Sequence, residues 1–245
     1  LAAILLECDR DPVAGFKVNF DGTLSLLEAA RHTAGFRRFV YASSKSAFGA
    51  LEGEWGYPNY APVKEDHPRR PNTTYGMTKK VAEEIAALFR DHYGLDVVIA
   101  RFGTTCGPGK GERHGASSVT SRMIEEAVDG RPVSVAQGGE ERDDIFYNLD
   151  IARGLVQAAL QPELRYHTYH LGSGQLITLG DLVEAIRKIV PAADIKVGGG
   201  LDFMGLGMGN YCLMDISRAR HDLGFRPHTL EDWVADYVSR YRAAA

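Results

Sequence analysis

The chain has 245 residues, of which 44% are hydrophobic and 24% charged, and its formal net charge is −4. These values are typical of a folded globular protein with one large domain or two closely joined domains. The negative net charge provides no basic surface for nucleic acid, and no apolar run reaches the length of a membrane span. The first residues also lack the charged and apolar regions of a signal peptide. We therefore expect a cytoplasmic protein without nucleic-acid or membrane partners.

The cysteines indicate neither disulfides nor a metal centre. The chain has three, and they are widely spaced: Cys8, Cys106 and Cys212. Reduced thiols in an intracellular protein are the simplest interpretation, and we expect no bound metal.

The first predicted element is a helix over residues 12–33. Asp11 can cap the free amides of its first turn, and Pro12 suits the first helical position. Apolar residues continue along this segment, and Gly35 is expected to end it.

A buried strand is predicted over residues 38–44, where an apolar run ends in Ser43 and Ser44. A long loop follows as far as Pro71. Long ordered loops at the carboxyl edge of a sheet usually contribute to a functional site.

The next predicted helix, over residues 73–93, is central to the sequence. Thr73 or Thr74 can cap it, and apolar residues follow at helical spacing. Tyr75 and Lys79 lie one helical turn apart and therefore on one face. An ammonium group next to a phenol stabilises phenolate, so we expect the pKa of Tyr75 to fall below its usual value of about 10. Tyr75 is therefore a candidate general acid or base.

Residues 96–101 form the following predicted strand, which completes a strand–helix–strand unit of a parallel sheet. In open α/β sheets ligands bind at the carboxyl edge, where Ser44 and Tyr75 would meet. The remaining predicted elements are helices over 117–128, 150–160, 179–189, 217–223 and 230–241, and a strand over 166–171.

Four segments, in this order, resemble the extended short-chain dehydrogenase/reductase family, and within it the NAD-dependent epimerase/dehydratase branch. They are Tyr-Ala-Ser-Ser at 41–44, Tyr-Gly-Met-Thr-Lys at 75–79, Arg-Phe-Gly-Thr-Thr-Cys-Gly-Pro at 101–108, and Arg-Asp-Asp-Ile-Phe-Tyr-Asn-Leu-Asp-Ile-Ala at 142–152. The resemblance implies an α/β fold with a Rossmann-type doubly wound parallel sheet. It places an NAD-binding domain at 1–108 plus about 148–172, and a small α/β substrate domain at 109–147 and 173–245.

The resemblance also implies that the sequence begins at the end of the fourth strand of this fold. The glycine-rich turn that would receive the pyrophosphate of a dinucleotide is absent. We expect about 60 residues of βαβ structure to precede the printed sequence.

The family pattern implies roles for individual residues. Ser44, Tyr75 and Lys79 would be catalytic, transferring hydride between NAD and a secondary alcohol of a carbohydrate, and NADP remains an alternative cofactor. The cofactor would contact Ala2, Ala3, Asn19, Ser43, Tyr75, Lys79, Phe102 and Gly103. The substrate would contact Ser44, Lys45, Ser46, Thr104 and Arg142, the last through its phosphates.

The resemblance leaves three functions open. The first is a sugar epimerase, the second a dehydrogenase of a free sugar acid, and the third a non-catalytic NAD(P)-binding remnant. A 4,6-dehydratase is disfavoured, because Lys45 and Ser46 stand where dehydratases carry an acidic pair. Thr104 replaces the usual asparagine, and no arginine stands at 204–210, which weakens the case for a nucleotide sugar. The helices at 12–33 and 73–93 are expected to form a homodimer contact.

Overall fold

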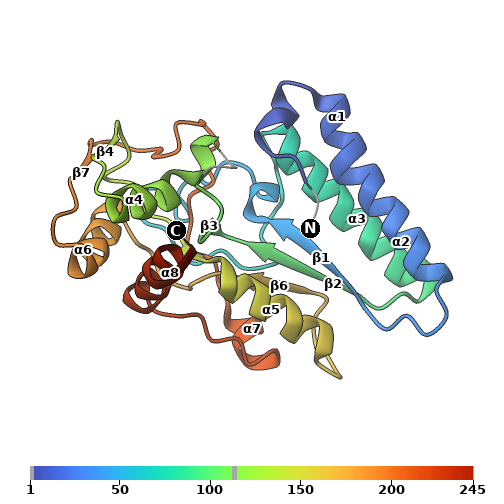
Figure 1. The fold of residues 1–245 in the computed structure, drawn as a ribbon. Helices are drawn as coiled ribbons and strands as arrows, with labels where there is room; N and C mark the ends of the chain where they lie inside the picture. The colour runs from blue at the N-terminus through green and yellow to red at the C-terminus, as the bar shows by residue number, and fades with distance from the viewer. Residues whose placement is uncertain (1–2, 112–114, 245) are drawn as a thin grey trace.

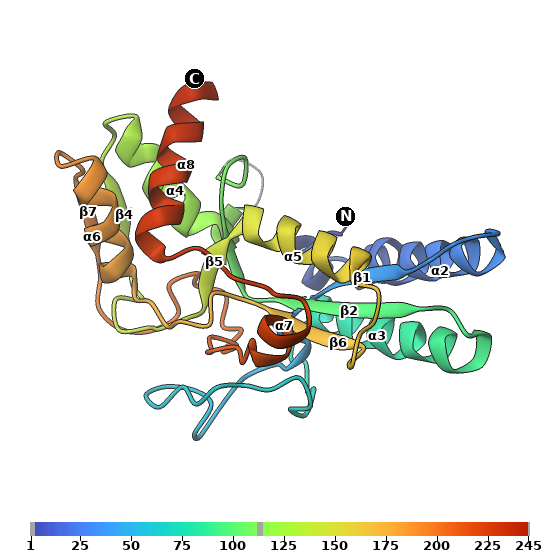
Figure 2. The ribbon, with the colours of Figure 1, turned by 90° about the horizontal axis from the view of Figure 1, so that it is seen from below.

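Three parallel strands form the central sheet of the protein. The structure is a computed structural model that describes residues 3–111 and 115–244. The strands lie in the order β1 (Phe39–Ser44), β2 (Val97–Phe102) and β6 (Thr168–Leu171). Helix α3 (Thr74–Tyr93) covers one side of this sheet and α5 (Asn148–Leu160) covers the other, as Figure 2 shows. This arrangement confirms the predicted doubly wound α/β fold.

The register of the sheet brings the carboxyl ends of its strands together. Ser44 lies opposite Phe102, which in turn lies opposite Leu171. The middle strand β2 is buried over residues Val97 to Arg101, because helices cover both of its faces. Side chains that follow β1 and β2 therefore share one edge of the sheet.

A second group of elements lies beyond this edge (Figure 1). It consists of β3 (Thr104–Cys106) paired with β5 (Ile145–Tyr147), β4 (Val133–Val135) paired with β7 (Ile195–Val197), and helices α4 (Val119–Val128), α6 (Leu179–Ile189) and α8 (Leu230–Ala244). These elements enclose a core of their own, in which the Trp233 ring stacks on Tyr147 at 5.9 Å between centroids. The boundaries predicted for the two domains remain a prediction.

Several short elements connect these helices and strands. They are the 3-10 turns η1 (Leu6–Asp9), η3 (Lys45–Ala47) and η4 (Gly115–Ser118), and helix α7 (Ser217–Asp222). All three cysteines are free, buried thiols, as expected. Within the described ranges no helix combines the length and apolar character needed to cross a membrane.

The first predicted helix differs from expectation in its middle. Asp11 caps it, with the Asp11 carboxylate accepting from Ala14 N at 3.0 Å, and α1 covers Pro12–Phe16. A π-helical turn, η2 (Lys17–Asp21), then separates α1 from α2 (Gly22–His32). Such turns insert an extra residue into a helix and often mark functional sites. Sequence periodicity did not predict this turn, which contains Asn19.

Helix α3 begins and ends as its sequence predicts. The Thr73 hydroxyl accepts from Gly76 N at 3.0 Å, which identifies Thr73 as the cap. Gly94 ends the helix with φ of 67°, in the left-handed region that glycine favours. The helix packs on α2 and β2 through buried side chains that include Leu27, Ala86 and Phe89.

A buried ion pair joins α3 to the two strands beneath it. The Arg101 guanidinium on β2 donates to both carboxylate oxygens of Glu83, at 2.8 and 2.7 Å. Ser43 on β1 donates to the same carboxylate, and Arg69 adds a further bond at 2.6 Å. Glu83 is 1% exposed and Arg101 3% exposed. This pairing fixes the position of α3 over the sheet.

Glu83→Ala should therefore destabilise the protein strongly, because it leaves the Arg101 charge buried without a counter-ion. We expect a loss of about 3–5 kcal/mol in the free energy of unfolding, measured by urea denaturation. Glu84→Ala is the matched control, since Glu84 is the next residue of the same helix and also pairs with Arg69, but is exposed. Its cost should stay below about 1 kcal/mol. Equal losses in the two variants would contradict this assignment.

Candidate active site

The first turn of α3 sits directly on the 3-10 turn that follows β1. A Cβ atom on Gly76 would lie only 2.3 Å from the Ser46 carbonyl oxygen, so glycine is required for this approach. The close contact brings the Tyr75 phenol near the Ser44 hydroxyl, which influences the pKa of the phenol. Two of the predicted catalytic residues therefore meet, although they come from different elements.

The pKa of the Tyr75 phenol is not lowered in this structure. Burial raises the pKa of Tyr75 to about 12, and the nearby Ser44 hydroxyl acts in the opposite direction. The sequence predicted a lowered pKa through the Lys79 charge, and that expectation was wrong for the chain as it stands. The free-energy cost of removing a phenolate from water is larger than the stabilisation that the neighbouring groups provide.

Lys79 lies beneath the phenol and is itself desolvated. Its Nζ donates to the Ala42 carbonyl oxygen at 2.8 Å, and lies 5.6 Å from the centre of the Tyr75 ring. The side chain is 7% exposed, and burial lowers the pKa of Lys79 to about 8. Because an ammonium group has three N–H donors, two remain for a ligand.

A chain of hydrogen bonds runs from Ser44 into the Gly-rich segment before α7. The hydroxyls of Ser44 and Ser46 lie 3.1 Å apart, and Ser46 N donates to Ser44 Oγ at 3.1 Å. Asn210 Nδ2 donates to Ser46 Oγ at 3.1 Å, while Asn210 is 2% exposed. Ser46 was predicted as a substrate ligand, but in the structure it bonds to Ser44 and Asn210 and so fixes the position of Ser44.

Lys45 and Thr104 were also predicted as substrate ligands, and both contact Asp143. Lys45 forms a buried ion pair with the Asp143 carboxylate, to which the Thr104 hydroxyl donates. Cys212 N donates to the same carboxylate at 2.9 Å. These side chains connect the end of β1 to the end of β2 and to the C-terminal third.

The predicted cofactor residues have different surroundings. Ala2 lies outside the described residues, and Ala3 is exposed. Asn19 is buried, exchanges two hydrogen bonds with the Ile4 backbone at 2.9 Å each, and donates to Thr78 Oγ1 at 3.2 Å. Asn19 thus ties the start of the chain to α3 behind Tyr75.

The remaining cofactor residues lie at the strand ends. The Ser43 hydroxyl is bonded to Glu83, so only its backbone is available to a ligand. Phe102 and Gly103 are partly buried where β2 ends, and a Cβ atom on Gly103 would lie 2.8 Å from the Asp144 carbonyl oxygen. Glycine is needed there for close backbone packing.

Arg142 is exposed, and it forms no ion pair with any residue in the described ranges. Its neighbour Glu141 is buried and accepts a hydrogen bond from the Tyr60 hydroxyl. The guanidinium of Arg142 is therefore free to reach a ligand, and its phosphate-binding role remains a prediction.

Sequence reasoning missed Asp143 and Asn210. Asp143 could have been found, because it directly follows Arg142 in the quoted motif and a second carboxylate there suggests a buried partner. Asn210 carries no signal, since only the fold brings it to Ser46.

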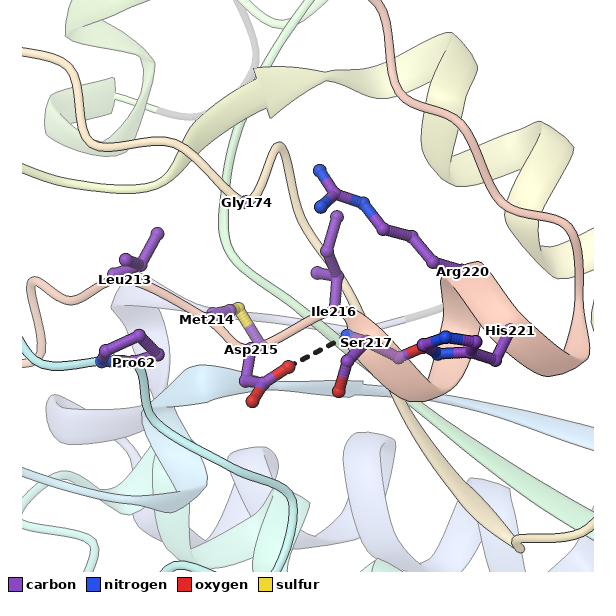
Figure 3. A pocket seen from close by; sticks show the side chains of 9 residues that line it. All are labelled: Pro62, Gly174, Leu213, Met214, Asp215, Ile216, Ser217, Arg220 and His221. Atoms are coloured by element: carbon purple, nitrogen blue, oxygen red, sulfur yellow. Dashed lines mark hydrogen bonds between the residues drawn. The ribbon is translucent and has the colours of Figure 1, made fainter.

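A surface hollow of about 280 Å³ lies away from these residues, between Pro62 and helix α7 (Figure 3). Its lining includes Gly174, Asp215 and Arg220, and Asp215 accepts from Ser217 N at 2.8 Å. Ser44, Tyr75 and Lys79 do not line it, so we do not assign the chemistry to this hollow.

Comparison with known proteins identifies the family. The sequence profile described as "NAD dependent epimerase/dehydratase family" matches residues 5–172. The chain belongs to this family. A dTDP-glucose 4,6-dehydratase of Actinoplanes is 30% identical over 228 residues, covering 92% of this chain and 66% of the relative. A putative UDP-glucose 4-epimerase of Methanocaldococcus jannaschii is 29% identical, covering 73% of this chain and 55% of the relative.

The chain thus spans less than two thirds of these family members. Solved structures share its fold at low identity. A UDP-glucose 4-epimerase from Thermotoga maritima, solved with UDP-glucose, superposes with a TM-score of 0.83 at 23% identity, covering 100% of this chain and 76% of the other. An L-threonine dehydrogenase from Cupriavidus necator gives 0.85 at 24% identity, covering 98% and 77%. The same fold therefore carries proteins named for different substrates.

The residues at the sheet edge fit one part of an NAD molecule. Lys79 has free N–H donors that suit the hydroxyls of a ribose. The phenol and the serine hydroxyl beside it suit a reacting oxygen. For the pyrophosphate, the described residues contain no glycine-rich turn between a strand and a helix. The fit therefore concerns the nicotinamide side of the cofactor.

Lys79→Met should stabilise the folded protein at neutral pH. The pKa of Lys79 falls from 10.5 to about 8 on folding, so the protonated side chain costs stability below pH 8. We expect a gain of about 2 kcal/mol, because loss of the bond to Ala42 offsets part of the relief. As pH rises from 8 to 10.5, the wild type loses this proton in the folded state and the difference should shrink. Urea denaturation at several pH values measures it, and a difference independent of pH would contradict the burial of this charge.

Proposed function

We propose that the protein is an NAD-dependent oxidoreductase acting at a secondary alcohol of a sugar or sugar derivative, and most specifically a sugar epimerase. The observation that carries the proposal is the meeting of Ser44, Tyr75 and Lys79 at the carboxyl end of β1. A phenol, a hydroxyl and an ammonium in this arrangement can move a proton at one oxygen atom.

Each side chain has a separate task in this proposal. When bound, NAD would supply a hydride acceptor. The Tyr75 hydroxyl would exchange a proton with the substrate oxygen, while Ser44 would donate a hydrogen bond to that oxygen as negative charge develops. With the pKa of Tyr75 at about 12, the phenol holds its proton and is ready to protonate a carbonyl oxygen. Taking a proton requires additional positive charge near the phenol. Lys79 supplies part of that charge and two donors for a ribose.

The names of the relatives support a sugar substrate. They include UDP-glucose 4-epimerases and dTDP-glucose 4,6-dehydratases. A dehydration needs groups that remove a second proton and expel water. Directly after Ser44 this chain carries Lys45, whose charge is neutralised by Asp143, and the serine hydroxyl of Ser46. Neither offers a carboxylate, which favours epimerisation over dehydration.

A dehydrogenase of a free sugar acid is the second candidate. The Thr104 hydroxyl is bonded to Asp143, so it is not available to contact a nucleotide-linked sugar. The segment 204–210 contains no arginine for a diphosphate. Assays with nucleotide sugars and with free aldonates and uronates, read by absorbance of reduced nicotinamide and by product analysis, would separate the two.

Tyr75→Phe tests the proposal directly. It should lower kcat/KM by about 10²–10⁴-fold, because the phenol oxygen is the group that exchanges the proton. Tyr93→Phe is the control, since this tyrosine lies on the same helix and is 52% exposed. The measurement is turnover of the best sugar substrate by the full-length protein, together with NAD affinity by titration. Undiminished turnover in Tyr75→Phe would exclude the proposed chemistry. Wild-type protein that binds NAD but turns over no sugar would instead favour a non-catalytic NAD(P)-binding remnant.

The same proposal includes a homodimer formed through the helices at 12–33 and 73–93. Large apolar side chains are exposed there: Val13, Val18, Leu26, Met77, Leu88 and Tyr93. Exposed apolar patches of this kind often mark protein contacts.

Leu26→Asp with Leu88→Asp should convert a dimer into a monomer, because two carboxylates would be buried against apolar surface. Sedimentation velocity measures the change. Leu160→Asp on α5, where the leucine is 72% exposed, should leave the assembly unchanged. A monomeric wild type, or dissociation by the α5 variant alone, would contradict this contact.

A further inference from the structure

Lys110 is a cation that the proposed reaction does not use. It lies in the loop after β3, and its side chain turns back onto that strand. Its Nζ donates to the Thr105 carbonyl oxygen at 2.6 Å and to Thr105 Oγ1 at 2.9 Å. Both acceptors are neutral, and the residue is partly buried. The ammonium is therefore held in one place by its own strand.

No carboxylate within the described ranges pairs with Lys110. Glu125 approaches the same loop, since a Cβ atom on Gly111 would lie 1.7 Å from its Oε2. Its other oxygen, however, accepts from the Tyr237 hydroxyl at 2.6 Å, and Glu125 makes no ion pair with Lys110. A partly buried ammonium without a counter-charge is costly, because water is removed and nothing replaces its stabilisation.

The neighbouring groups do not remove this cost. Burial is the main cause that lowers the pKa of Lys110 to about 8. The Cys106 thiol acts in the opposite direction, and the positive charge of Lys45 lowers the pKa further. Lys45 is paired with Asp143, but Lys110 has no such partner in the described chain. An unpaired positive charge thus remains at the end of β3.

The position of this charge relates it to the candidate active site. Lys110 is anchored on Thr105, the residue after Thr104, whose hydroxyl contacts Asp143. Asp143 pairs with Lys45, which directly follows Ser44. A series of hydrogen bonds, one ion pair and neighbouring residues therefore leads from Lys110 to Ser44, the proposed catalytic serine.

We propose that Lys110 binds an anionic oxygen of the substrate, supplied by a carboxylate or by a phosphate group. Two of its three N–H groups are used by Thr105, and the third is free to donate to such an oxygen. The bond would be charge-assisted and would supply the missing counter-charge. This inference rests on the proposed function, and it identifies an acidic sugar derivative as the substrate class.

Competitive acetylation of the lysines, read by mass spectrometry over a range of pH, tests the proposal without turnover. Free Lys110 should titrate with a pKa near 8 and react faster at pH 8 than Lys188, which is exposed at the surface and paired with Glu231. Pyrophosphate and D-glucuronate are the two anionic probes, with D-glucose as the neutral one. One anion should slow acetylation of Lys110 by about tenfold or more, while glucose and Lys188 show no effect.

The protecting anion identifies the source of the charge. Protection by glucuronate indicates a carboxylate, and protection by pyrophosphate indicates a phosphate. If neither anion slows the reaction of Lys110, or if glucose does so equally, the proposal is wrong.

Variants give a second measurement. The protecting anion should raise the thermal midpoint of the wild type, because it binds only the folded state. Lys110→Met should lose this shift and Lys110→Arg should keep part of it, while Lys188→Met behaves as wild type. Lys110→Met should also fold readily, since it removes a desolvated charge. A shift retained in full by Lys110→Met would contradict the assignment.

Failure of this inference can be distinguished from failure of the proposed function. Turnover of neutral sugars with no protection of Lys110 would refute the anion site alone. Protection of Lys110 in a protein that oxidises and epimerises no sugar would refute the proposed function alone.

Discussion

The buried carboxylate of Glu83 is the interaction on which the arrangement of the site depends. It accepts hydrogen bonds from Arg101 on β2 and Ser43 on β1, and it stands one turn after Lys79 on α3. A helix held only by apolar contacts could slide on a sheet, but a bidentate ion pair in a dry environment has one geometry. The distance between the α3 side chains and the end of β1 is therefore set by an electrostatic contact below the site.

The buried cations around the site differ in their partners. Arg101 and Lys45 are each matched by a buried carboxylate, Glu83 and Asp143. Lys79 and Lys110 donate hydrogen bonds only to neutral oxygens. Paired charges maintain the fold, whereas cations with spare donors remain available to ligands. By this criterion Lys45 maintains the fold, whereas Lys79 and Lys110 are the lysines that we propose to bind ligands.

The sequence was sufficient to predict the fold and part of the site, for physical reasons. Thr73 and Gly94 define the ends of α3 through local capping rules, and the shared face of Tyr75 and Lys79 follows from helical spacing. Long-range partners were not predictable. Lys45 and Thr104 were predicted as ligands because only the fold shows that both bind Asp143, and the pKa of Tyr75 was misjudged because desolvation depends on the packed structure.

The π-helical turn at Lys17–Asp21 has a consequence for engineering. Deleting one residue there would give an uninterrupted α-helix, which most stability-directed redesigns would favour. Because such a turn accommodates one extra residue, the helix on either side would keep its orientation, and only side chains within the turn would change direction. Asn19 could no longer bridge the Ile4 backbone and Thr78 at the same time. The π-helical turn thus allows Asn19 to make these contacts, and a more ideal helix would disconnect the segment around Ile4 from α3.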